Sequence, residues 1–377
     1  MKVTFCERID EIPAAQWNGL LSRAQPFVRH EFLNALEVHG CVGEIFGWLP
    51  RHIAVTEGDR LVGALPLYEK RNSFGEFVFD HAWANAYHQL GMRYYPKLVS
   101  AVPYTPVCGP RLLVRDEDRR RVCPVLLEAV RQLADAMGAS SFHCLFPGDE
   151  DQDWLEQRQF LVRHDCQYHW RNRGYSDFEV FLSTLSAKKR KNIRRERRVV
   201  AEAGIRFRLL DGHAATEADW HAFAHFYRDT FLSKGNTPPL NEAFFMAVAQ
   251  DMPDQVLLVL ARRGGKTIAG SLMWRDAEAL YGRYWGCSET MDSLHFETCY
   301  YQGIDYCIEQ GLRVFEPGAQ GEHKIARGFV PVLTRSSHWL QDTPLLEPIR
   351  QYVQREQAVV SAYKRKLELR VPYKNVP

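Results

Sequence analysis

Two segments of the chain follow the same order of strands and turns. His52 to Asp80 and Leu257 to Gly286 each read as a strand, a turn with glycine or aspartate, a second strand, a polar turn and a third strand. Gly63 and Gly270 take equivalent places in the middle strands, where glycine often marks a close backbone approach. Helical segments precede each copy, and a helix and a strand follow it. The sequence therefore predicts that one helix–meander–helix–strand unit occurs twice.

This repeat predicts an α/β protein with two domains and mixed, mostly antiparallel sheets flanked by helices. The first copy continues into a helix at Arg119 to Met137 and a strand at Ser141 to Leu145. The second continues into a helix that Gly311 ends, then a short strand at Leu312 to Phe315. We place the two domains at residues 1–172 and 173–377, joined near Arg171 to Asp177.

Composition excludes several classes of protein. The chain has 377 residues, 46% hydrophobic and 25% charged, with a formal net charge of +2. It has no run of eighteen apolar residues, as a membrane span needs, and its beginning, MKVTFCERIDEIP, has no apolar signal core. The nine cysteines are scattered without a CxxC spacing, which argues against a disulfide framework or a zinc site. We expect a cytoplasmic protein that binds no metal and no cofactor tightly.

A polar loop follows the last strand of the second copy. In residues 316–328 it gathers Glu316, Glu322, His323, Lys324 and Arg327 among glycines. Helix, strand and then a glycine-rich polar loop is an arrangement by which α/β proteins place reactive groups at strand ends. A solvated loop with internal ion pairs would have the same composition.

Several stretches resemble a known family. They are GWLPRHIAV, LPLYEKRNSFGEFVFDHAWANAY, YYPKLVSAVPYTPVCGPRLL, KKRKNIRRERR and FETCYYQGIDYCIEQGLRVFEPGAQGEHKIARGF, which together extend over most of the chain. They look like the FemAB-like branch of the GCN5-related N-acyltransferase (GNAT) superfamily, in the group of predicted N-acyltransferases. The loop FEPGAQGEHK also resembles the FxxxxGxxxYK pattern of tandem acyltransferases, with His323 where a tyrosine is common.

The resemblance implies tandem GNAT-like domains and an enzyme that moves an activated acyl group from acyl-CoA, as co-substrate, to an amine, which includes a lipid or cell-envelope amine. One departure leaves the donor open. Single-domain acetyl-CoA enzymes carry a glycine loop that cradles the pyrophosphate, whereas GCSETMDSLHF has only Gly286 at that place. FemAB-type relatives that use aminoacyl-tRNA in cell-wall peptide synthesis also lack this loop. That aminoacyl transferase is the alternative, and a non-catalytic module that keeps the GNAT fold is the third reading.

N-acyl transfer needs a base for the amine and donors for the carbonyl oxygen. Glu316 and His323 are the candidate catalytic bases, and Glu322, Lys324 and Arg327 are candidate contacts of the ligand or the loop. In the preceding helix, Tyr300 falls on the apolar stripe and is expected in the core. Glu297 and Tyr301 fall off it and are candidate substrate contacts, and we expect Tyr301 to face a cleft. Glu297 also suits the positive end of the helix dipole without any function.

The long segment of residues 82–114 is predicted to be an insertion that binds substrate. It is rich in aromatic side chains, and Pro103, Pro106 and Pro110 keep its second half extended. Plain packing is the alternative. The candidate contacts are Trp83, Tyr87, Tyr94, Tyr95, Lys97, Thr105 and Arg111.

Residues 186–203 are predicted to form a strongly basic helix, with Ser186 as its cap. Because like charges repel along a helix, this density favours an anionic partner over a merely solvated face. CoA phosphates, an anionic membrane surface and tRNA are the alternatives, and a membrane partner would make the protein peripheral at the inner face of the membrane. The candidate phosphate contacts are Lys188, Lys189, Arg190, Lys191, Arg194 and Arg195. The sequence does not indicate the oligomeric state.

Overall fold

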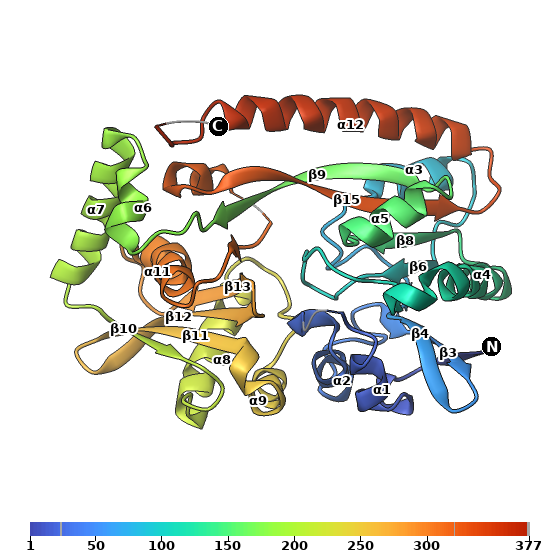
Figure 1. Ribbon diagram of the computed structural model, residues 1–377, viewed down its shortest axis with the longest axis horizontal. Coiled ribbons are helices and arrows are strands. Elements are labelled where there is room, and N and C mark those ends of the chain that lie inside the picture. Colours follow the sequence, from blue (N-terminus) through green and yellow to red (C-terminus); the bar gives the residue numbers. More distant parts are fainter. Residues whose placement is uncertain (23–24, 320, 375–377) are drawn as a thin grey trace. The chain divides into compact units, whose positions relative to one another are not determined.

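The computed structural model describes residues 1–22, 25–319 and 321–374, and its contacts divide the chain into two compact units (Figure 1). Unit 1 comprises residues 1–165 and 333–362, and unit 2 comprises residues 166–332 and 363–377. The predicted division after residue 172 differs from this because residues 333–362 belong to unit 1. A strand and a helix near the end of the chain therefore complete the first unit, a return that no local pattern in the sequence indicates.

Unit 2 contains one sheet whose strands follow the order β10, β11, β12, β13, β14 and β9. The first four are antiparallel neighbours, among them β11, β12 and β13 of the predicted meander, and β13 and β14 are parallel. A parallel pair requires a crossover, and helical residues between β13 and β14 supply it. The bounds are β9 (Leu161–Arg171), β10 (Arg206–Leu210), β11 (Val256–Arg263), β12 (Lys266–Arg275), β13 (Ala279–Cys287) and β14 (Val314–Glu316).

Helices of unit 2 bury their apolar faces against this sheet. α8 packs on β12 and β13, while α7 contacts the helical crossover and the polar loop (Figure 1). The helices are α6 (Phe178–Ser183), α7 (Ala187–Glu202), α8 (Glu217–Leu232), α9 (Glu242–Asp251), α10 (Leu294–Phe296), the π-helical turn η5 (Glu297–Tyr301), α11 (Gln302–Glu309) and the 3₁₀ turns η4 (Pro253–Gln255) and η6 (Glu322–Arg327). α7 confirms the predicted basic helix, although the Ser186 side chain makes no capping hydrogen bond.

Unit 1 divides its strands between two sheets. One has the order β1, β3, β4 and β7, and the other places β8, β6, β5 and β2 beside the final residues of β15. β6 and β8 form a parallel pair, the counterpart of β13 and β14 in unit 2. The bounds are β1 (Lys2–Cys6), β2 (Trp48–Pro50), β3 (His52–Glu57), β4 (Arg60–Leu65), β5 (Tyr68–Lys70), β6 (Lys97–Ser100), β7 (Leu113–Val114), β8 (Ser141–Leu145) and β15 (Val330–Leu340).

The first predicted meander is interrupted after its second strand. β3 and β4 pair as expected, but β5 joins the other sheet beside β6. Pro66 precedes β5 and offers no backbone N–H, so the chain leaves the first ladder there. The segment of residues 82–114 likewise differs from the predicted insertion, because it contains β6, a central strand of the second sheet.

The remaining elements of unit 1 are helical. They are α1 (Ala14–Asn18), α2 (His30–Val38), α3 (His81–Gln89), α4 (Arg119–Met137), α5 (Asp149–Glu156), α12 (Leu346–Glu368) and the 3₁₀ turns η1 (Ile9–Glu11), η2 (Pro26–Val28) and η3 (Asp116–Asp118). α12 begins in unit 1 and ends in unit 2. Gly63 explains how α4 approaches the sheet: a Cβ atom there would lie 2.4 Å from Val122 of α4. The predicted close approach at this strand glycine is confirmed.

Candidate functional site

The parallel strand pair of unit 2 ends at a buried ion pair. The last register partners of β13 and β14 are Tyr281 and Glu316. Just beyond them Arg283 donates to the carbonyl oxygens of Gly282 at 2.9 Å and Glu316 at 3.1 Å. Its Nη2 also lies 3.4 Å from Glu316 Oε2. The guanidinium thus spans the point where the two strands stop pairing, and Glu316 holds it there.

Lys324 is the most strongly perturbed group in the polar loop. Its side chain is buried, with 3% of the residue exposed, and its Nζ donates to the Gly318 carbonyl at 2.7 Å. It forms no ion pair with any residue in the described ranges of the chain. Burial, with a further contribution from Arg283, lowers the pKa of Lys324 to about 7. An amine with this pKa is partly neutral and partly charged near neutral pH.

His323 lies next to Lys324 in sequence but reaches the surface. Its Nε2 lies 2.9 Å from the Tyr300 hydroxyl, and its ring contacts Phe296 and His295. Partial burial and the nearby Lys324 and Arg327 lower the pKa of His323, so the neutral imidazole prevails at pH 7. Gly321 makes this placement possible, because a Cβ atom there would lie 2.4 Å from the His323 ring.

A π-helical turn redirects the side chains of the preceding helix. Because η5 contains one more residue per turn than an α-helix, the predicted apolar stripe is offset within it. Glu297 and Tyr301 are buried as a result, so the expectation that Tyr301 faces a cleft is wrong. Tyr300 is in the core, as predicted. Burial raises the pKa of the Glu297 carboxyl, whose Oε2 has no hydrogen-bond partner within the described residues.

The inner face of the basic helix holds this turn and the polar loop in place. Glu196 of α7 accepts from Arg327 at 2.9 Å and from the Tyr301 hydroxyl. Arg197, the next residue, pairs with Glu297 at 3.2 Å and with Asp305 at 2.7 Å. Glu196 and Arg197, two neighbouring residues of α7, therefore hold both the polar loop and the π-helical turn in place.

The other predicted loop residues have structural partners. Arg327 also donates to the His323 carbonyl at 2.9 Å and lies over the Phe296 ring. Glu322 accepts from Tyr363 at 2.8 Å and pairs with Arg370, which ties the loop to the last helix within unit 2. These contacts order the loop around His323 and Lys324.

The outer face of α7 carries most of the predicted phosphate contacts. Lys188, Lys191 and Arg195 are exposed and recur on one side of the helix. Arg194 is exposed but pairs with Glu179, while Lys189 and Arg190 are half-buried, and Arg190 donates to the Leu185 carbonyl at 3.2 Å. Three of the six predicted phosphate contacts thus form an exposed row, and the other three are half-buried or paired within the protein.

The predicted contacts in unit 1 lie inside the protein. Lys97 is fully buried and pairs with Glu76 at 2.8 Å and with Asp80. Asp80 also accepts from the Tyr94 hydroxyl at 2.5 Å, and Tyr95 shares Ser73 with this cluster. Although burial opposes the charge, the two carboxylates raise the pKa of Lys97. We name Lys97, Glu76, Asp80, Tyr94 and Ser73 the Lys97 cluster.

Its neighbours are equally buried. Arg111 donates to the carbonyl oxygens of Val107, Gly109, Pro110 and Leu145 at 2.7 to 3.1 Å, and so binds loop backbone. Trp83 and Tyr87 belong to a hydrophobic cluster with Tyr94. Thr105 is buried too. Together these residues pack unit 1 from within, which favours the packing interpretation of segment 82–114 over an exposed binding loop.

Arg283, Glu196 and Arg197 were not predicted from the sequence as residues of the site. Arg283 interrupts the apolar run of β13, and a charge inside a buried strand was a usable signal. Glu196 and Arg197 were hidden in a run that reads as uniformly basic. No group of His, Cys, Asp and Glu side chains suited to a metal ion occurs in residues 1–22, 25–319 and 321–374. Within the same ranges, no helix is long and apolar enough to cross a membrane.

Comparison with known proteins identifies the family. A family model described as FemAB-like, peptidoglycan biosynthesis/recognition, matches residues 8–375, so the chain belongs to the FemAB-like family. A search of curated proteins gives no match. Family and fold together support a transferase that acts in cell-envelope biosynthesis.

Solved structures confirm the predicted fold class of tandem GNAT-like domains. FemX is similar with 11% identity and a TM-score of 0.54, over 93% of this chain and 100% of that one. The C-terminal domain of a putative lysylphosphatidylglycerol synthetase from Agrobacterium fabrum is similar with 9% identity and a TM-score of 0.51, over 92% and 96%. A conserved protein of unknown function from Bacteroides thetaiotaomicron has 13% identity and a TM-score of 0.53, over 90% and 100%.

Proposed function

We propose that this FemAB-like protein is an N-acyltransferase that joins an activated acyl group to an amine, with the reacting centre in unit 2. The observation that carries the proposal is the surroundings of the buried Lys324 amine. It lies beside Arg283, and no carboxylate in the described residues pairs with Lys324. A positive group held without a counter-charge favours binding of an oxygen that becomes negative during reaction. An acyl carbonyl under attack has such an oxygen.

In the proposed reaction the amine attacks the acyl carbonyl carbon, and a tetrahedral intermediate forms. His323 takes the proton of the attacking amine, because its imidazole is neutral at pH 7 and exposed. Protonated Lys324 and Arg283 stabilise the oxyanion. The intermediate then collapses, expels the leaving group and leaves the amide. Glu316, the other base candidate, positions Arg283 through their ion pair.

The donor is proposed to be an acyl-CoA, with Lys188, Lys191 and Arg195 available to its phosphates. The acceptor is proposed to be an amine of the cell envelope, a choice that rests on the family. Mass-tagged acyl-CoA incubated with a panel of amines tests the reaction, and amide product is the expected result. Absence of transfer to any amine, together with absence of acyl-CoA binding, contradicts the donor assignment.

The pH profile of this reaction tests the roles of the two groups. Activity should rise as His323 loses its proton, below its ordinary pKa of 6.5, and fall above pH about 7 as Lys324 loses its own. His323→Ala should remove the rising limb and most of the activity. A rate that increases steadily through pH 7 would assign the base to Lys324 instead.

Aminoacyl-tRNA is the second candidate donor, and the exposed row of cations on α7 is the observation that supports it. Three cations on one helix face suit a nucleic-acid backbone as well as they suit CoA. The affinity for tRNA, measured against salt concentration, separates the two donors. A steep fall of affinity with salt, lost in a Lys188→Ala, Lys191→Ala, Arg195→Ala variant, supports tRNA. No tRNA binding at low salt removes this candidate.

A further inference from the structure

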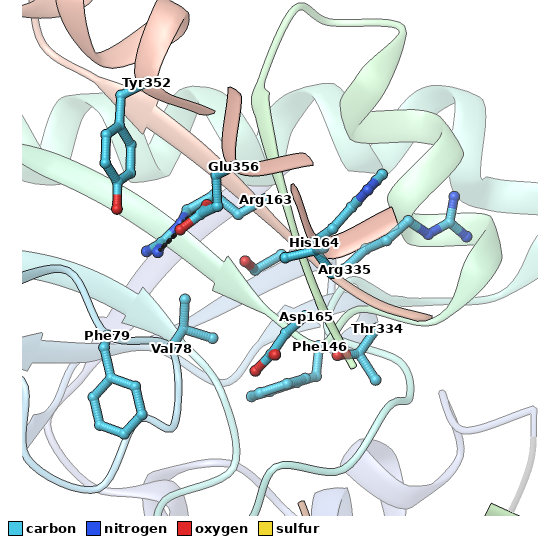
Figure 2. A pocket seen from close by; sticks show the side chains of 12 residues that line it. Val78, Phe79, Phe146, Arg163, His164, Asp165, Thr334, Arg335, Tyr352 and Glu356 are labelled. Atoms are coloured by element: carbon cyan, nitrogen blue, oxygen red, sulfur yellow. Dashed lines mark hydrogen bonds and ion pairs between the residues drawn. The ribbon is translucent and has the colours of Figure 1, made fainter. Parts of the chain in front are cut away.

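A pocket of about 290 Å³ lies within unit 1, and the proposed transfer chemistry does not use it (Figure 2). β9 and β15 each contribute three consecutive lining residues, α12 contributes Tyr352 and Glu356, and the loop before α3 contributes Val78 and Phe79. Phe146 closes one side. All the lining residues belong to unit 1.

Buried polar atoms of the lining have no partner within the protein. Arg163 is 8% exposed and binds Glu356 through Nε at 2.8 Å and Nη2 at 2.7 Å, but its Nη1 has no hydrogen-bond partner. In Figure 2 the guanidinium points toward the side that Tyr352 and Val78 form. The Thr334 hydroxyl and His164 Nδ1 are also buried without a partner. Such groups usually find a partner, and a ligand oxygen would supply it.

The backbone around the pocket is strained at two bulky residues. Phe146 has φ of 51°, and Phe77, which precedes the lining residues Val78 and Phe79, has φ of 61°. Large side chains avoid this left-handed region, and such strain clusters at ligand sites. Phe79 itself is 60% exposed, although it is a large apolar residue at the pocket wall. Strain and an exposed aromatic ring thus coincide at the same cavity.

The charges of the lining disfavour an ionic ligand. The lining contains two basic residues, Arg163 and Arg335, and two acidic residues, Glu356 and Asp165, so its formal charges sum to zero. Glu356 already binds Arg163 in a fork, and Arg335 pairs with Asp149 of α5 at 2.6 Å. Because the lining carries two charges of each sign, neither a phosphate nor an organic cation would gain a net electrostatic attraction there. The pocket therefore suits an uncharged molecule.

The remaining polar groups both donate and accept. The Thr334 hydroxyl and the neutral imidazole of His164 each do both, whereas the Ser336 hydroxyl already bonds His338 at 2.8 Å. The carboxylates accept beside the Arg163 donor. A ligand whose hydrogen-bond donors and acceptors alternate at short intervals matches this lining. Hydroxyls on successive carbons give shorter intervals than successive peptide groups do. The aromatic rings of Phe79, Phe146 and Tyr352 offer flat apolar surface to the ring of such a ligand.

We propose that this pocket binds a neutral pyranose ring, with its hydroxyls on Arg163 and Thr334 and one face against Phe79. The volume of about 290 Å³ suits one small ring compound and no larger chain. This binding site goes beyond the proposed transfer reaction, and its test does not depend on activity.

The test uses the full chain and three pyranoses that differ in charge: N-acetylglucosamine, glucosamine and glucuronate. Saturation-transfer NMR and titration should show that neutral N-acetylglucosamine binds most tightly. Equal or tighter binding of either charged sugar overturns the charge argument. Tighter binding of a capped, uncharged dipeptide overturns the choice of a sugar. Absence of N-acetylglucosamine binding overturns the site.

Two variants connect the binding to this pocket. Thr334→Val keeps the side-chain shape and removes a hydroxyl that has no protein partner, so it should weaken sugar binding about threefold to tenfold without destabilising the fold. Phe79→Ala should weaken it by a similar factor. The matched controls are Ser100→Ala, which removes another buried hydroxyl without a partner, and Phe5→Ala, which removes another exposed ring of unit 1. Unchanged affinity in both test variants overturns the proposal.

Discussion

Lys97 in unit 1 and Lys324 in unit 2 are both buried, yet their surroundings shift their pKa values in opposite directions. Two carboxylates, Glu76 and Asp80, surround Lys97 and raise its pKa. Lys324 meets a backbone carbonyl and the positive Arg283, and burial lowers its pKa to about 7. Burial alone therefore does not decide the charge of a lysine, because the partners decide it. A fully paired amine holds the fold together, whereas an amine left without a carboxylate remains available for chemistry.

Asp80→Asn should produce the largest loss of stability. It removes one carboxylate from the Lys97 cluster and leaves a buried charge short of its partner. Breaking a buried pair in this way costs about 3 to 5 kcal/mol. Urea unfolding should show a lower midpoint. Asp10→Asn, at an exposed ion pair with Arg8, is the control and should change little. An unfolding free energy that Asp80→Asn leaves intact would mean that Lys97 is not stabilised as described.

Lys324→Met should have the largest effect on activity. Loss of one oxyanion donor costs about 10² to 10³ in rate. Because the substituted lysine has no ion pair within the described residues, the fold should remain at least as stable at neutral pH. Steady-state kinetics and thermal unfolding measured together separate the two outcomes. Full activity in this variant would remove Lys324 from the mechanism.

The contrast between the two lysines was beyond the reach of the sequence. The helix at Arg119 to Met137 and the strand at Ser141 to Leu145 have the bounds that local periodicity predicts. By contrast, Glu76 and Asp80 stand 21 and 17 residues before Lys97, and nothing local marks them as its partners. Periodicity reports which side of an element is buried, but it does not report which groups meet there.

The candidate site shows the same limit. The sequence picked out the polar loop and its residues, including Lys324, because glycines and charges cluster there. It placed Tyr301 on the wrong side because a π-helical turn adds one residue to the helical period. It predicted that the charged side chains of α7 face water or an anionic partner, whereas Arg197 pairs with Asp305, 108 residues further along the chain. The first error comes from a change in helix geometry and the second from a contact between residues far apart in the sequence, and a local sequence pattern shows neither.

Stability should depend on pH because of Lys324. Its folded pKa of about 7 lies below its ordinary value of 10.5, so the unfolded chain binds more protons between these values. Stability should therefore rise with pH in this window, by about 1.4 kcal/mol per pH unit for one such lysine. Lys70 in unit 1, also shifted to about 7, should contribute a similar slope.

Comparison with a variant isolates the contribution of Lys324. Chemical unfolding of the wild type and of Lys324→Met, measured between pH 7.5 and 9.5, should give stabilities whose difference narrows as pH rises, with the variant more stable at the lower pH. Lys70→Met provides the same measurement in unit 1. A constant difference across this range would show that Lys324 keeps an ordinary pKa, and the comparison with Lys97 would then fail.

Glu196→Gln should have the smallest effect and tests how the basic helix supports the loop. Arg327 and Tyr301 donate to different oxygens of Glu196, so glutamine keeps an acceptor for one of them and removes the charge that the buried Arg327 faces. Arg327 also binds the His323 carbonyl, so a weakened contact should disturb the base. We expect about a tenfold loss of activity, equivalent to about 1.4 kcal/mol. Glu179→Gln is the matched control, because Glu179 pairs with Arg194 on the exposed side of the same helix. If both substitutions reduce activity equally, α7 acts through its overall charge, and its inner face does not position the site.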